Sequence, residues 1–134
     1  MLRILIALVL VAHGIGHSLG LLHIFKVATV NPAWHGDSWI LTGIVGSSVT
    51  QVVGVILWTV ALVGFVALAA VVMSWLPATW WVPLAVASSV ASLGGLLLFP
   101  IAFPPVSTIG AFVVDAAVLA AVVWFDWAPD DLPA

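Results

Sequence analysis

Two histidines, one helical turn apart, interrupt the first long apolar run of this chain. They are His13 and His17, within the stretch AHGIGHSLG of residues 12–20. On a helix, at about 100° of rotation per residue, their side chains lie only about 40° apart. An imidazole ring can bind a metal ion, exchange hydrogen bonds or relay a proton. The pair therefore raises the question of which of these chemistries it serves.

Two glycines extend the histidine pair into one stripe. Gly16 lies about 60° from His13 around the helix, and Gly20 lies about 20° from it. Small residues at such spacings let a neighbouring helix or a ligand come close to the backbone. Gly14 points away from this stripe, and the sequence indicates no role for it.

One carboxylate can meet these histidines at the same depth. Asp115, in GAFVVDAAVLAAV, is the only other ionisable residue expected well inside an apolar run. His13 lies about 15 Å along its helix from Arg3, and Asp115 lies about 16 Å along its helix from Asp126. A charge in mid-bilayer costs at least about 2.5 to 3.5 kcal/mol, and a partner removes part of that cost. We therefore predict that Asp115 faces inward and bonds to His13 or His17.

Three uses of such a site can be compared, and haem ligation is disfavoured first. Both histidines lie on one helix, so they cannot bind opposite faces of one haem. A metal is an alternative, because His13, His17 and Asp115 would form a two-His, one-carboxylate set for iron or zinc. That alternative would make the chain a metal-dependent membrane enzyme.

We prefer a site without a cofactor, in a membrane component that is not an enzyme. The predicted ligand is a lipid-soluble small molecule, such as a quinone or an isoprenoid, or else the site relays protons. The ligand-binding set would be His13, His17, Asp115, Gly16 and Gly20. The remaining alternative is that the histidines and Asp115 only tie two helices together.

The composition requires apolar surroundings for this site. The chain has 134 residues, of which 65% are hydrophobic and 5% charged. Soluble domains carry about 25% charged residues, so most of this surface must face lipid. Only two residues are lysine or arginine, which excludes a nucleic-acid partner, and the lack of cysteine excludes disulfides and thiolate metal sites.

The apolar runs predict an all-α fold, an integral membrane four-helix bundle with up-and-down topology. Crossing the bilayer takes about 20 apolar residues. We expect a single transmembrane domain over residues 1–134, with spans at about 2–25, 49–75, 80–99 and 108–125. The start of the first span is read as part of the helix and not as a cleaved signal peptide. A short interfacial helix is predicted near residues 39–45, between the first two spans.

The polar residues of the other spans are read mainly as packing residues. Ser88, Ser92 and Gly95 share one face of the third span, as small residues at helix contacts in membranes often do. Four spans put both termini on one side of the cell membrane. Arg3 favours the cytoplasm for that side, although Lys26 at the other end opposes it. Besides the bilayer and a small molecule, the partners left open are further copies of the chain or a larger membrane complex.

The sequence also resembles an uncharacterised family of small bacterial four-span membrane proteins whose first span carries HGxxHxxG. Here the motif runs from His13 to Gly20 as HGIGHSLG, and the segments WWVPLAVASSVAS and IGAFVVDAAVL are similar to that family too. There is a looser likeness to DoxX-like proteins in size and span number. The resemblance implies the four-span architecture and implies no activity.

Overall fold

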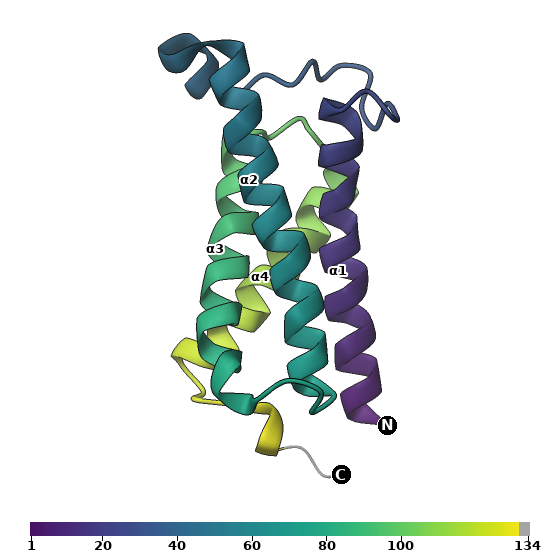
Figure 1. Cartoon of the computed structure of the whole chain (residues 1–134), viewed down its shortest axis with the longest axis vertical. Helices are drawn as coiled ribbons and strands as arrows, with labels where there is room; N and C mark the ends of the chain where they lie inside the picture. Colours follow the sequence, from purple (N-terminus) through teal and green to yellow (C-terminus); the bar gives the residue numbers. More distant parts are fainter. Residues whose placement is uncertain (132–134) are drawn as a thin grey trace.

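Four long helices form an up-and-down bundle (Figure 1). A computed structural model of the chain describes residues 1–131, which contain helices and no strand. The long helices are α1 (Leu2–Ile24), α2 (Leu41–Val72), α3 (Trp81–Leu98) and α4 (Pro105–Val123). Short 3₁₀ turns, η1 (Ala78–Trp80) and η2 (Pro129–Asp131), precede α3 and follow α4. The predicted four-helix bundle is confirmed.

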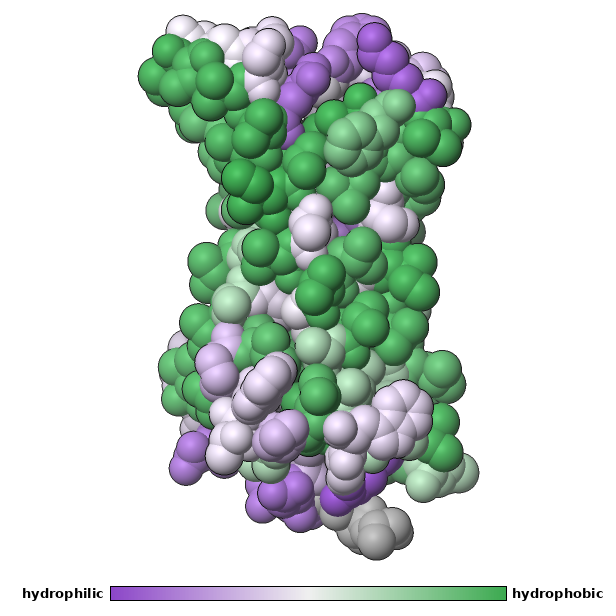
Figure 2. Space-filling view, in the orientation of Figure 1, coloured by the Kyte–Doolittle hydropathy of each residue, from purple (hydrophilic) through white to green (hydrophobic). Residues whose placement is uncertain are grey.

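Each of these four helices is long and apolar enough to cross a membrane. On the face shown in Figure 2, hydrophobic side chains cover the middle of the molecule, and hydrophilic ones gather toward its two ends. By the length and composition of its helices, the chain is a multi-pass membrane protein.

The second helix begins earlier than the predicted residue 49. It starts at Leu41 and bends at Gly46, whose backbone angles (φ 79°, ψ 164°) are not helical. These angles belong to a region that essentially only glycine adopts. The side chain of Thr50 donates a hydrogen bond to the Gly46 carbonyl at 2.8 Å. The short helix expected near residues 39–45 is therefore residues 41–45, joined to the second span across this bend.

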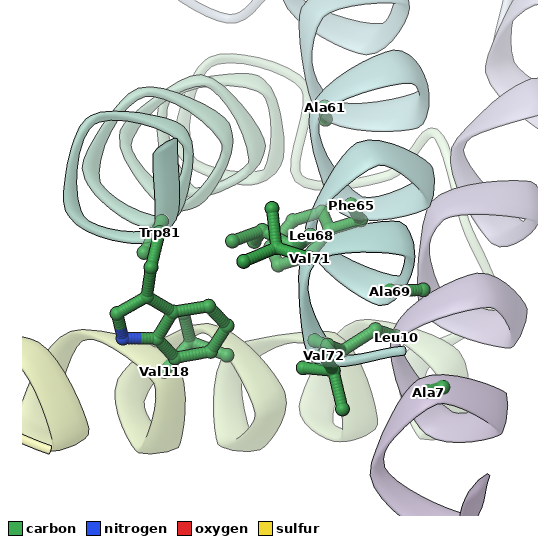
Figure 3. Close-up of a cluster of buried hydrophobic side chains, with 11 residues drawn as sticks. Ala7, Leu10, Ala61, Phe65, Leu68, Ala69, Val71, Val72, Trp81 and Val118 are labelled. Atoms are coloured by element: carbon green, nitrogen blue, oxygen red, sulfur yellow. The ribbon is translucent and has the colours of Figure 1, made fainter. Parts of the chain in front are cut away.

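The helices pack in chain order. Helix α1 lies along α2, α2 along α3, and α3 along α4, whereas α1 and α4 have no contact of similar extent. A buried apolar cluster joins the helices toward the end that holds the N-terminus (Figure 3). Phe65 and Leu68 of α2 lie within it, with Leu10 of α1 and Trp81 of α3. The bundle thus has a well-packed side along α1, α2 and α3, and an open seam between α1 and α4.

Glycines allow two of these helix contacts to be close. A methyl group on Gly14 would lie 3.0 Å from the Leu62 carbonyl oxygen of α2, and one on Gly64 would lie 2.6 Å from the Ser88 Cβ of α3. Gly14, which had no role in the sequence, therefore sets the approach of α1 to α2.

The segment between α1 and α2 covers the carboxyl end of α3. The Ser38 hydroxyl donates to the Leu98 carbonyl at 2.7 Å, and the Trp39 indole donates to the Leu97 carbonyl at 2.8 Å. These bonds satisfy carbonyls that a helix end leaves without partners. At the opposite end, Arg3 donates to Ser74 at 2.7 Å, just beyond the end of α2.

Candidate functional site

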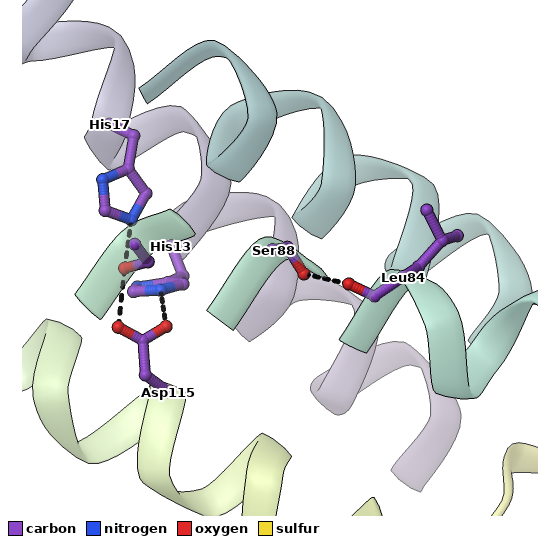
Figure 4. A network of polar contacts seen from close by, with 6 residues as sticks. His13, His17, Leu84, Ser88 and Asp115 are labelled. Atoms are coloured by element: carbon purple, nitrogen blue, oxygen red, sulfur yellow. Dashed lines mark hydrogen bonds and ion pairs between the residues drawn. The ribbon is translucent and has the colours of Figure 1, made fainter. Parts of the chain in front are cut away.

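Asp115 bonds to side chains from two other helices. Its Oδ1 lies 2.9 Å from His13 Nε2 of α1, and its Oδ2 accepts a hydrogen bond from the Ser92 hydroxyl of α3 at 2.6 Å. The Ser92 oxygen lies 2.9 Å from His17 Nε2 (Figure 4). The predicted inward-facing Asp115 and its bond to a histidine are confirmed. His17, however, reaches Asp115 only through Ser92.

The hydrogens in this network can be assigned by counting donors. A serine hydroxyl has one hydrogen, and Ser92 donates it to Asp115. Ser92 must then accept at its oxygen, so His17 carries its hydrogen on Nε2. In a neutral ring this leaves Nδ1 of His17 as an acceptor. That atom is buried and has no hydrogen-bond partner within residues 1–131.

Aromatic rings fix the two imidazoles. The His13 ring packs edge-on against Phe65, with ring centroids 4.3 Å apart, and against His17 at 4.9 Å. Phe103 packs edge-on against His17 at 6.2 Å. His17 is buried and Asp115 is completely buried, so the carboxylate itself is shielded from lipid and water.

A cavity of about 390 Å³ lies beside the histidines, between α1 and α4. Its walls are mostly apolar, and the residues that line it are Val9, Ala12, His13, Gly16, His17, Leu19, Leu96, Phe103, Ser107, Gly110, Ala111 and Val114. Val9 and Leu19 on its rim are 44% and 39% exposed, so the cavity opens on the lipid-facing surface of the bundle. Asp115 does not line it, because it lies behind the histidines.

A second apolar cavity continues the seam toward the end that holds the N-terminus. It has a volume of about 480 Å³ and shares Val9 and Val114 with the first. Trp81 and Trp127 line its far part, where the Trp81 indole donates a hydrogen bond to the Trp127 carbonyl. The groove between α1 and α4 is therefore longer than the part next to the histidines.

The predicted glycine stripe divides into two surfaces. Gly16 lines the cavity, and a methyl group added there would meet no atom within 4 Å. A methyl group on Gly20 would lie 2.6 Å from the Trp58 ring of α2. Gly20, a member of the ligand set predicted from the sequence, therefore packs against α2 and does not line the cavity.

The geometry does not favour the metal alternative. Among residues 1–131, no three His, Asp or Glu side chains are arranged to hold a metal ion. The Nε2 atom of His17 is directed at the Ser92 hydroxyl and not at a point shared with His13 and Asp115.

Ser92 is the member of the network that sequence reasoning missed. It shares a face with Ser88 and Gly95, and the interpretation as packing holds for Ser88, whose hydroxyl donates to the Leu84 carbonyl of its own helix (Figure 4). The signal in the sequence that could have identified Ser92 was its depth in the membrane, because it lies near the middle of α3.

No protein-family model, curated protein or solved structure matches this chain. The function is therefore argued from the chemistry of the site.

Proposed function

We propose that this protein is a non-enzymatic membrane component that binds a lipid-soluble small molecule in the cavity between α1 and α4. The observation that carries the proposal is the Nδ1 atom of His17, a buried acceptor with no partner within residues 1–131 on a residue that lines the cavity. Leaving such an acceptor unpaired costs about 1–3 kcal/mol. A ligand hydroxyl would remove that cost if the side chains that cover this atom moved aside as the ligand entered.

The walls of the cavity suggest the class of ligand. Its volume, about 390 Å³, falls within the range typical of small-molecule sites. Apolar walls with a rim in the lipid-facing surface suit an apolar molecule that enters from the bilayer. A hydrogen-donating head group would suit His17, as in a quinol or an isoprenoid alcohol.

The hydrogen bonds of Asp115 and Ser92, behind the cavity, support a role for these two residues in orienting the histidine rings. Asp115 and Ser92 bond to the Nε2 atoms of both rings, which leaves the opposite nitrogen of His17 as acceptor. We further propose that the protein resides in the cell membrane with both termini in the cytoplasm, which Arg3 supports through the positive-inside rule.

The experiment compares molecules that remain bound through purification. The protein is purified in detergent, extracted with organic solvent and analysed by mass spectrometry, together with Gly16→Leu and Gly43→Leu. Neither glycine has an atom within 4 Å of an added methyl group, but only Gly16 lines the cavity. We expect an apolar hydroxylated molecule with the wild type and Gly43→Leu, and its loss from Gly16→Leu.

A competing outcome would establish that the network only ties helices together. In that case the wild type retains no small molecule in stoichiometric amount. Equal retention by Gly16→Leu and the wild type would also contradict the proposal. Thermal unfolding of both variants verifies that the loss of a molecule does not follow from loss of the fold.

A further inference from the structure

A second, polar cavity lies at the end of the bundle away from the N-terminus. It has a volume of about 450 Å³ and is bounded by the end of α1, the segment after it and the start of the long part of α2. The residues lining it are His23, Ile24, Lys26, Thr29, Pro32, Trp34, His35, Gly36 and Gln51. It shares no residue with the cavity between α1 and α4, and it contains no acidic side chain.

The tautomer of His23 is set by the backbone. The Val30 amide donates to His23 Nδ1 at 3.3 Å, so the neutral ring carries its hydrogen on Nε2. The buried Trp34 ring packs against this imidazole with centroids 4.5 Å apart and holds its orientation. His23 is thus a hydrogen-bond donor in both its neutral and its charged form.

Other side chains near His23 in this cavity can donate hydrogen bonds but have no acceptor within residues 1–131. The side chains of Lys26, His35 and Gln51 make no hydrogen bond or ion pair within residues 1–131. The Gln51 amide group packs closely against the backbone at Gly36. A methyl group added to Gly36 would lie only 2.8 Å from the amide nitrogen of Gln51. The nearest acid along the chain, Asp37, is exposed and does not line the cavity. The cavity is therefore lined by several hydrogen-bond donors and one lysine, and by no carboxylate.

Lys26 occupies a backbone position where glycine is usual. Its φ is 58°, and α1 ends there with bonds from the Lys26 amide to the His23 carbonyl and from the Val27 amide to the Leu22 carbonyl. This is the Schellman ending, in which a left-handed residue follows the helix. A non-glycine residue there costs about 1–2 kcal/mol. A lysine in place of glycine brings an ammonium group to the cavity.

The cavity lies at the level of lipid head groups. Lys26 lies two residues after an apolar helix of 23 residues, a length of about 34 Å that crosses the hydrocarbon core. Trp39, well exposed at this end, is an aromatic residue of the kind that gathers at the membrane interface.

We propose that this cavity binds a phosphate group, with Lys26, His23 and Gln51 as its donors and His35 at its rim. A phosphate accepts hydrogen bonds from several directions through its oxygens, which matches donors that converge from α1, α2 and the intervening segment. The volume exceeds that of a bare phosphate and accommodates a phosphate ester. The ester is carried either by an anionic phospholipid, as basic pockets at membrane surfaces bind head groups, or by a soluble compound.

The test measures binding of two probes to the intact protein. One probe is phosphatidylglycerol, titrated into nanodiscs of phosphatidylcholine, and the other is inorganic phosphate added to the same nanodiscs. We expect phosphatidylglycerol to bind the wild type, and we expect Lys26→Gln to weaken this binding about tenfold or more because a charge-assisted hydrogen bond is lost. Lys26→Arg, which keeps the charge, should stay within about threefold of the wild type.

Neutral substitutions separate a site from general surface attraction. Gln51→Leu removes a donor without changing the charge and should also weaken binding, whereas Thr59→Leu, at an exposed position further along α2, should not. Binding of phosphatidylglycerol alone identifies a lipid source, and binding of both probes identifies a soluble phosphate compound. Binding of neither probe, or equal binding by the wild type, Lys26→Gln and Gln51→Leu, would overturn the proposal.

Discussion

Ser92 is the residue on which the polar network depends. Its hydroxyl is both the donor to Asp115 and the acceptor from His17, so one side chain of α3 links a carboxylate of α4 to an imidazole of α1. A second serine lies three residues earlier on the same helix. Ser89 is equally buried, but its hydroxyl has no partner within residues 1–131. The two serines therefore form a natural pair for comparison.

We expect Ser92→Ala to lower the free energy of unfolding by about 1–2 kcal/mol, because it leaves Asp115 and His17 each without a partner. Ser89→Ala should change it by less than about 0.5 kcal/mol, since no hydrogen bond is lost. Thermal unfolding in one detergent, followed by circular dichroism, measures both. Equal losses in the two variants would contradict the role given to Ser92.

The histidines and Asp115 could be related from the sequence, whereas Ser92 could not. Counting residues from the charged ends of two antiparallel helices placed His13 and Asp115 at one depth, and that arithmetic needs no knowledge of packing. The role of Ser92 depends on how α3 is rotated relative to α1 and α4. A single helix does not contain that information, because serine on a membrane helix serves packing as readily as hydrogen bonding.

At the scale of the helices, glycines one turn apart serve different neighbours. Gly16 faces the cavity and Gly20 faces Trp58 of α2, although both lie on the face that carries the histidines. Gly14, outside that face, lies against α2 as well. Helical spacing thus identified the residues of α1 that matter but not the neighbour that each one meets.

We expect Gly20→Ala to destabilise the protein by about 1–3 kcal/mol, because its methyl group would overlap the Trp58 ring. Gly16→Ala adds the same group to empty space in the same helix, and it should leave stability unchanged or raise it by up to about 1 kcal/mol through helix propensity. The two midpoints of thermal unfolding test this order. A larger loss for Gly16→Ala would show that the division of the glycines is wrong.

The four spans were predictable from the sequence because a helix that crosses lipid needs a long, continuous apolar run. Continuous apolar runs with turn residues between them specify four helices, and the observed bounds of α1, α3 and α4 differ from expectation by only a few residues. The start of α2 was missed because Gly46 bends the helix without ending it. The hydropathy of a sequence does not distinguish the end of a helix from a bend within it.

At the scale of the whole molecule, the up-and-down order puts the first residues and the turn at Pro129–Asp131 at one end, and the segment between α1 and α2, which contains Thr29, at the other (Figure 1). The chain contains no cysteine, so a single introduced thiol reports its own position. Thr29→Cys and Asp130→Cys are both at exposed positions.

We expect a membrane-impermeant maleimide to label only one of these two variants in intact cells, and to label both after the membrane is opened. For termini in the cytoplasm, Thr29→Cys is the variant labelled from outside. The fraction of labelled protein is read by mass shift on a gel. Labelling of both variants in intact cells would contradict the topology.

The order in which the helices pack has a consequence for how the protein is made. Chains are synthesised from the N-terminus, so α1, α2 and α3, which lie side by side, are complete before α4 exists. At that stage His13 and His17 have been synthesised, but Asp115, which bonds to His13, has not. Asp115 arrives last, on the helix with the fewest buried residues, and its carboxylate is what this helix contributes to the polar interior. The hydrogen bonds of Asp115 to His13 and Ser92 can therefore form only after α4 has been synthesised, when the other two residues are already in the chain.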